Sequence, residues 1–81
     1  MKATINNVNI RGCEEKQGKG GAYLLVRFED ETGQAHELVD KEINRKEYYK
    51  RDTDGTLNID IAIGKWTTIR IVDFKIAEAI K

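Results

Sequence analysis

The stretch from Ala22 to Val39 constrains the fold more than any other part of the sequence, because its pattern is that of two strands joined by a turn. Its first arm is apolar and β-prone, and Asp30-Glu31-Thr32-Gly33 then supplies a polar turn that ends in glycine. One face of the first arm can close a small core, with Leu24, Val26 and Phe28. The other face mixes an aromatic, an aliphatic and a cationic side chain, as base stacking and phosphate contact require: Tyr23, Leu25 and Arg27. The second arm carries Ala35, Leu38 and Val39. The sequence therefore predicts a β-hairpin with one apolar face and one face of mixed aromatic, aliphatic and cationic side chains.

Apolar alternation predicts three further strands. The first runs from Ala3 to Arg11, with a bulge at Asn6-Asn7 that restores the phase of its apolar residues. The clearest alternation follows the turn signal Asp54-Gly55, with apolar residues at every second position from Leu57 to Ile63. The last strand runs from Thr68 to Ala77. Its apolar residues change face between Ile71 and Val72, which implies a second bulge or a sharp coil of the strand.

The remaining segments are expected to connect these strands. Gly12 to Gly21 is rich in glycine and is expected to form a mobile loop. Asp40 to Asp54 is expected to form either a short helix or an irregular excursion. Gly64 to Thr67 is expected to be a turn, and Glu78 to Lys81 a frayed tail.

The order of these elements favours one fold class. Five strands, with the helix-compatible segment between the third and the fourth, are the elements of the OB-fold, a Greek-key β-barrel. An SH3-like barrel also has five short strands and is the rival interpretation. A chain of 81 residues is too short for two cores, so residues 1–81 are expected to form a single all-β, OB-fold-like domain.

Composition limits the partners that the chain can attract. Its 14 basic and 14 acidic residues cancel, so nucleic-acid binding must depend on local charge separation. Cys13 is the only cysteine, which excludes an internal disulfide and fits a reducing compartment. The N-terminal residues lack the apolar core of a signal peptide, and no apolar run approaches the ~20 residues of a membrane span. We therefore expect a soluble, cytoplasmic protein without a membrane partner.

The sequence does not favour catalysis. Cys13 and His36 each occur singly, without the spacing of zinc sites or of nucleophile and base pairs. The acidic groups Glu14-Glu15 and Glu29 to Glu31 fall in an expected loop and turn, where solvation explains them. Gln17 to Gly21 lacks the Gly-Lys-Ser/Thr ending of a triphosphate-binding loop. We therefore expect no enzymatic activity, no metal and no cofactor.

Aromatic residues close to cations are the candidates for nucleic-acid contact. Tyr48-Tyr49-Lys50-Arg51 places two aromatics in the densest basic run, and we expect one tyrosine in the core and the other exposed. The glycine-rich segment beside Tyr23 is either a solvated connector or a loop whose Lys16 and Lys19 close over a phosphate backbone. Trp66 lies in a turn, where its large apolar ring either folds back on the barrel or meets a base or a partner protein.

Two segments carry a resemblance to a known family. Lys16-Gln17-Gly18-Lys19, followed by Tyr23-x-Leu25, resembles the basic-Gln-Gly-Lys-Pro-Tyr-x-Leu segment of the single-stranded-DNA-binding, helix-destabilising proteins of filamentous phages. Ile63-Gly64-Lys65-Trp66 is similar to the Val-Gly-Gln-Phe turn of the same family. The present chain has Gly20-Gly21-Ala22 in place of the proline, and its turn Asp30 to Gly33 lacks the aromatic of the family's DNA-binding wing. The resemblance implies an OB-fold homodimer that coats unpaired DNA cooperatively in DNA replication, with Tyr23 and the Trp66 turn contacting DNA.

The leading functional hypothesis is therefore sequence-independent binding of single-stranded DNA by a non-catalytic homodimer, with RNA as an unresolved alternative ligand. Bases are expected to stack on Tyr23, Trp66 and one of Tyr48 or Tyr49. Phosphates are expected to contact Arg11, Lys16, Lys19, Arg27, Lys50 and Arg51. The alternative is a protein-interaction barrel that acts as a subunit of a phage or mobile-element complex, with Trp66 as the anchor and no direct nucleic-acid contact.

Overall fold

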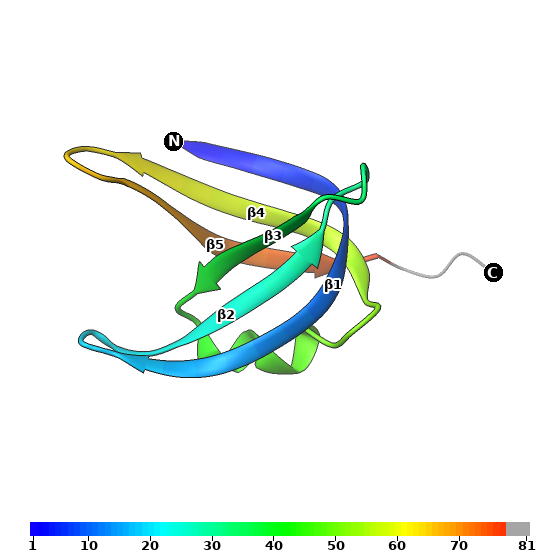
Figure 1. Cartoon of the computed structure of the whole chain (residues 1–81), viewed down its shortest axis with the longest axis horizontal. Helices are drawn as coiled ribbons and strands as arrows, with labels where there is room; N and C mark the ends of the chain where they lie inside the picture. Colours follow the sequence, from blue (N-terminus) through cyan, green and yellow to red (C-terminus); the bar gives the residue numbers. More distant parts are fainter. Residues whose placement is uncertain (78–81) are drawn as a thin grey trace.

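The computed structural model describes residues 1–77, and within them five β-strands close into a barrel (Figure 1). The elements are β1 (Lys2–Gly18), β2 (Gly21–Glu29), β3 (Ala35–Asp40), the 3-10 helix η1 (Ile43–Tyr48), β4 (Asp54–Ile63) and β5 (Thr67–Ile76). The strands are neighbours in the order β1-β2-β3-β5-β4, and β4 pairs in turn with β1. The β3–β5 pair is parallel and the other pairs are antiparallel. This is the arrangement of the OB-fold, so the predicted fold class is confirmed.

β1 belongs to both halves of the barrel because it bends. Its first residues pair with β4, and the residues from Asn9 onward pair with β2. The register with β4 shifts between Ile5 and Val8, and Asn7 in this interval has a positive φ of 58°. Asparagine adopts this left-handed conformation more readily than most residues. The bulge predicted at Asn6-Asn7 is therefore confirmed.

The prediction of a mobile loop from Gly12 to Gly21 is wrong. Residues Gly12 to Gly18 continue β1 and pair with β2 as far as Gly18 opposite Gly21, so that Lys19 and Gly20 alone form the turn. A β-carbon on Gly18 would lie 3.1 Å from Cε1 of Tyr23, so the tyrosine ring covers this glycine closely. At this position glycine permits a close contact within a hairpin, and its presence does not indicate a loop.

The predicted faces of the β2–β3 hairpin are confirmed. Leu24, Val26 and Phe28 are buried, whereas the side chains between them are half-buried or exposed. The core is formed by Val8, Ile10, Leu24, Val26, Phe28, Tyr49, Leu57, Ile59, Ile71 and Phe74. The predicted turn is also present, and Oδ1 of Asp30 accepts hydrogen bonds from the backbone N–H groups of Thr32 and Gln34. Hydrogen bonds from the Thr32 hydroxyl and, to a smaller extent, from His36 hold the pKa of Asp30 well below its usual range.

The change of face predicted in the last strand is confirmed as a bulge at Val72. Asn58 of β4 lies opposite Asp73, whereas the next residue, Ile59, lies opposite Ile71. Val72 is therefore the extra residue, and its insertion allows both Ile71 and Phe74 to reach the core.

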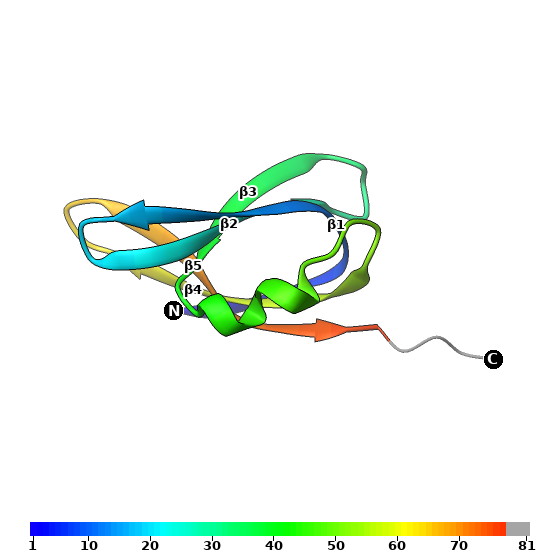
Figure 2. The same ribbon diagram turned by 90° about the horizontal axis from the view of Figure 1, so that it is seen from below.

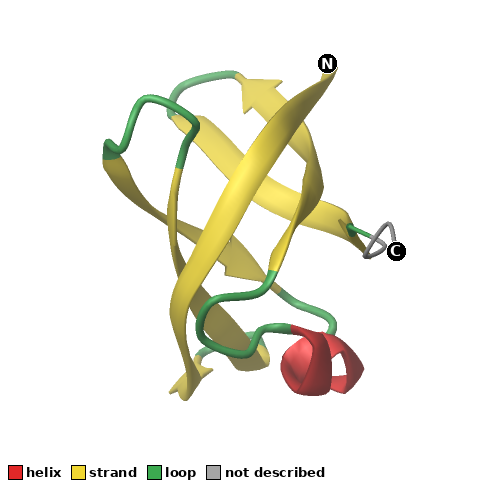
Figure 3. Cartoon of the chain, turned by 90° about the vertical axis from the view of Figure 1, so that its right-hand side faces the viewer, coloured by secondary structure: helices red, strands yellow, loops and turns green. Residues whose placement is uncertain are grey.

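The helix η1 covers one opening of the barrel (Figure 3) and is held there by a buried carboxylate. Asp40, at the end of β3, is fully buried and accepts a hydrogen bond of 2.7 Å from Nε of Arg45. The same carboxylate accepts hydrogen bonds from the Tyr49 hydroxyl and from the backbone N–H of Glu42. Burial and the hydrogen bond to Asp40 raise the pKa of Tyr49 far above its usual range, so its hydroxyl keeps its proton and remains a donor. Of the two possibilities for residues 40–54, the structure therefore contains a short helix.

The β1–β2 and β4–β5 hairpins project from the same end of the barrel, as two perpendicular views show (Figures 1 and 2). The predicted strand from Leu57 to Ile63 and the turn that follows it are part of the second hairpin. Among residues 1–77, no helix combines the length and apolar character needed to cross a membrane. The tail predicted at Glu78 to Lys81 lies outside the described residues.

The two adjacent tyrosines provide a test of the buried network. Replacement of Tyr49 by phenylalanine removes one hydrogen bond to the Asp40 carboxylate, and we expect a loss of about 1.5–3 kcal/mol in the free energy of unfolding, measured in urea. Tyr48→Phe is the matched control, because Tyr48 is exposed and its hydroxyl makes no hydrogen bond within residues 1–77. Equal stabilities of the two variants would contradict this role of Tyr49.

Candidate nucleic-acid interface

The outward-facing residues of β2 and β3 form the centre of the candidate interface. Leu25 of β2 lies opposite Val39 of β3, and Val39 lies opposite Arg70 of β5. Tyr23 faces the same side of β2 as Leu25, and its cross-strand neighbour on β1 is Lys16. The apolar centre of this face is thus bordered by cationic side chains on two sides.

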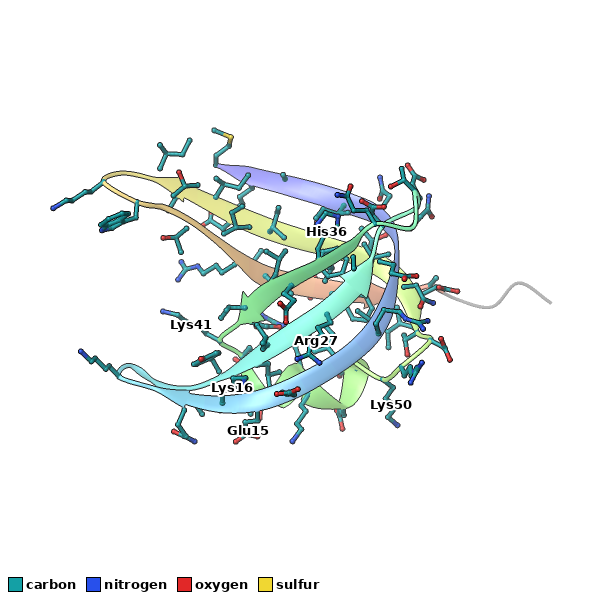
Figure 4. The ribbon with its side chains drawn as sticks, in the orientation of Figure 1. Glu15, Lys16, Arg27, His36, Lys41 and Lys50 are labelled. Carbon is teal, nitrogen blue, oxygen red and sulfur yellow. The ribbon has the colours of Figure 1, made fainter. Side chains whose placement is uncertain are left out.

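A shallow pocket of about 340 Å³ lies where this face meets the β1–β2 turn. Tyr23, Leu25 and Val39 provide its apolar surface, and Lys19 and Lys41 lie at its border. Among residues 1–77, neither lysine takes part in an ion pair. Figure 4 shows Lys41 at the end of β3, between the two projecting hairpins. The pocket therefore combines an aromatic ring with two available positive charges, as contact with a base and its phosphates requires. We call it the Tyr23 pocket.

Trp66 is one of the most exposed apolar residues of the described chain. It lies with Lys65 in the turn between β4 and β5, and its relative exposure is 78%. Of the two possibilities derived from the sequence, packing back on the barrel is therefore excluded. The β4–β5 turn and the β1–β2 turn lie at the same end of the molecule, so the tryptophan belongs to the same end as the Tyr23 pocket.

Two of the predicted cations lie on this face but are already engaged. Nε of Arg27 donates a 3.0 Å hydrogen bond to Glu37, and Nη2 donates a 3.1 Å hydrogen bond to Glu14. Lys16 Nζ lies 3.5 Å from the other carboxylate oxygen of Glu14. The hydrogen bond to Glu37 and the charge of Glu14 raise the pKa of Arg27. The four side chains form a chain of alternating charge, which we call the Arg27 network.

Four predicted site residues lie away from the Tyr23 pocket. Arg11 donates a 3.0 Å hydrogen bond to Asp52 and a longer one to Asn9. Tyr48 ends η1, and Lys50 and Arg51 follow it, with Lys50 on the side of the molecule remote from the two hairpin turns (Figure 4). These residues are therefore not brought to the Tyr23 pocket, because the connection from β3 to β4 carries this basic run past the other end of the barrel.

Tyr49 is a further correction to the predicted site. Its relative exposure is 3%, its ring stacks on Phe74 at a centroid distance of 5.2 Å, and its hydroxyl is bonded to Asp40. It is therefore not available to stack a base. Tyr48 is 44% exposed, so the prediction of one buried and one exposed tyrosine is confirmed.

Sequence reasoning missed Lys41 and Arg70 as members of the site. Lys41 follows the last residue of β3 and has the same parity as Val39, and this parity is the signal that would have placed it on the outer face. Lys41 and Arg70 also line a second hollow. This hollow adjoins the Tyr23 pocket, because Lys41 lines both. Arg70 contacts Asp60 only at 3.8 Å.

The described residues contain no arrangement typical of a metal site. No group of three or more His, Cys, Asp or Glu side chains in residues 1–77 is placed to bind a metal. Cys13 is half-buried, and burial raises the pKa of its thiol, which therefore remains protonated at neutral pH.

Comparison with known proteins adds no relative. No protein-family model, curated protein or solved structure matches this chain. The resemblance to the filamentous-phage proteins stays a prediction that depends on the short segments around Lys19, Tyr23 and Trp66.

Proposed function

We propose that this protein binds single-stranded DNA, largely without regard to sequence, and that it is not an enzyme. The observation that carries the proposal is the Tyr23 pocket, in which an aromatic ring and an apolar surface lie between two lysines without ion-pair partners in residues 1–77. In the OB-fold, the face of strands two and three and the loops after strands one and four are a common site for oligonucleotides. The Tyr23 pocket and the Trp66 turn occupy these positions.

Stacking accounts for the expected lack of sequence preference. A base placed on Tyr23 would contact Leu25 and Val39 with its edge and leave its phosphates near Lys19 and Lys41. Each stacked base contributes about 1–3 kcal/mol, and all bases present a similar π-face. Trp66 provides a second stacking surface for a base further along the strand. RNA can make the same stacking and phosphate contacts, so oligo-rU belongs in any test of the ligand.

The local charge distribution supports the proposal despite the net charge of zero. Lys19, Lys41, Lys65 and Arg70 all lie on the two hairpins or at the end of β3 between them. Many carboxylates of the described residues are engaged elsewhere, such as Asp40 with Arg45 and Asp52 with Arg11. The chain has a single cysteine and so cannot form an internal disulfide, which also supports a cytoplasmic location.

Fluorescence of Trp66, the sole tryptophan, provides the direct test. We expect oligo-dT to quench this fluorescence at low salt and the signal to recover as salt is added. The logarithm of the binding constant should fall by about 0.7 per logarithmic unit of salt for each phosphate contacted. Tyr23→Ala should weaken binding by about 5- to 150-fold, the equivalent of one stacked base.

Two double variants of equal charge change locate the site. Lys19→Ala/Lys41→Ala removes both lysines of the Tyr23 pocket and should reduce the salt slope by about 1.4, the share of two phosphates. Lys50→Ala/Arg51→Ala removes two cations on the remote side and should leave affinity and slope close to those of the unmodified protein. The reverse ranking of these variants would contradict the proposed location.

The proposal includes a homodimer, because apolar side chains remain uncovered along the β4–β5 hairpin. Ile61 and Ile69 are cross-strand partners, and the backbone N–H of Ile61 donates to the carbonyl of Met1, which brings Met1 beside this pair. Met1 and Ile63 are 73% and 70% exposed. Soluble monomers rarely leave contiguous apolar surface of this kind open to water, and a second copy can cover it symmetrically. We call Met1, Ile61, Ile63 and Ile69 the hairpin surface.

Sedimentation equilibrium tests the dimer. The unmodified protein should sediment as a dimer at micromolar concentration, and Ile63→Glu should shift it to a monomer because the new carboxylate would be buried at the interface. Ile76→Glu is the matched control, since Ile76 is also exposed but lies at the opposite end of β5. A monomeric unmodified protein, or dissociation caused by Ile76→Glu alone, would contradict this interface.

The hairpin surface also favours a second candidate function. Together with Trp66, it offers an aromatic anchor and flanking aliphatic groups, which is the composition of a protein-binding surface. In that case the protein would be a subunit of a phage or mobile-element complex without nucleic-acid contact. Unchanged Trp66 fluorescence with both oligo-dT and oligo-rU at micromolar protein would favour this function.

A further inference from the structure

The Arg27 network lies beside the Tyr23 pocket on the same face of the sheet. Glu14 is the cross-strand neighbour of Leu25, and Glu37 is the cross-strand neighbour of Arg27. Figure 4 shows Lys16 and Arg27 along the β1–β2 hairpin, with Lys41 at the end of β3. A strand that crosses the Tyr23 pocket and continues along β2 would therefore meet this network next.

The charges of the network are unfavourable for a phosphate. The two negative charges of Glu14 and Glu37 cancel the positive charges of Lys16 and Arg27, so the network offers a phosphate no net positive charge. Two of the N–H groups of Arg27 already donate to these carboxylates, at 3.1 and 3.0 Å. All three side chains are about half exposed, so the carboxylates face the water through which a phosphate would approach.

The lysines of the Tyr23 pocket are in a different situation. Lys19 and Lys41 have no carboxylate partner in the described chain, whereas Arg27 has two. The outer face thus divides into an end that attracts phosphates and an end at which Arg27 is already paired with two carboxylates. Exposed ion pairs are weak individually. The repulsion or attraction of a phosphate at each end therefore depends on the net charge there and not on a rigid geometry of the pairs.

Given the proposed strand-binding function, on which this inference rests, we propose that Glu14 and Glu37 withhold Arg27 from nucleic acid. The bound strand then makes its phosphate contacts at Lys19 and Lys41, and these contacts end where the two carboxylates begin. The network limits both the length of strand that one protein holds and the salt dependence of its binding.

Neutralising the carboxylates tests this inference. We expect Glu14→Gln/Glu37→Gln to bind oligo-dT more tightly at low salt, because Arg27 becomes free to contact one further phosphate. The salt slope should become steeper by about 0.7, so the advantage over the unmodified protein should shrink about 5-fold between 20 and 200 mM salt. Adding Arg27→Gln to the double variant should lower the slope again by about 0.7, the share of the one phosphate that Arg27 contacts.

Glu31→Gln/Glu47→Gln is the matched control. It makes the same change in net charge at two exposed carboxylates, one in the β2–β3 turn and one on η1. Glutamine at position 31 can still accept the hydrogen bond that Asn7 donates to Glu31. This variant should leave the salt slope unchanged, because neither site adjoins Arg27.

The outcomes separate this inference from the proposed function. If Glu14→Gln/Glu37→Gln behaves as the control does, or if the steeper slope persists after Arg27→Gln is added, the inference is overturned and strand binding stands. If the unmodified protein gives no fluorescence change and no mobility shift with oligo-dT, the proposed function fails and the inference fails with it.

Discussion

The bend of β1 at Asn7 is the constraint on which the rest of the structure depends. A barrel in the order β1-β2-β3-β5-β4 closes only if one strand pairs with both β2 and β4, and β1 does so by changing direction between Ile5 and Val8. A hairpin alone is marginally stable in water, so the two long hairpins depend on this shared strand. The same bend directs both hairpin turns to one end of the barrel and thereby brings the Tyr23 pocket and Trp66 to a common side.

Much of the barrel could be predicted because each strand has a buried and an exposed face. Alternation reveals such faces directly, and the two bulges appear in the sequence as changes of parity near Asn7 and Val72. The extension of β1 through Gly18 could not be predicted in the same way. Glycine content suggested a loop, whereas the strand is held by its pairing with β2 and by the ring of Tyr23 above Gly18. These are contacts between elements, which local composition does not report.

The candidate site was only partly predictable, for a related reason. A dense basic run such as Lys50-Arg51 shows that charge is present but not which side of the barrel receives it. Lys41, outside that run, reaches the Tyr23 pocket because the parity of β3 places it there. Arg27 was correctly placed on the outer face, yet its pairing with Glu37 follows from the register of β2 against β3, which requires the structure.

Under the proposed function, charge pairing also affects which nucleic acid the protein would retain. A strongly basic protein binds duplex and single strands alike through their phosphates. Here the net charge is zero and Arg27, Arg11 and Arg45 are each engaged by carboxylates, so charge alone provides few contacts. Under the proposed function, the larger share of the affinity would then come from stacking on Tyr23 and Trp66, which requires bases that are not already paired and stacked in a duplex. In the proposed function, the acidic residues thus favour selectivity for unpaired strands by keeping the electrostatic contribution small.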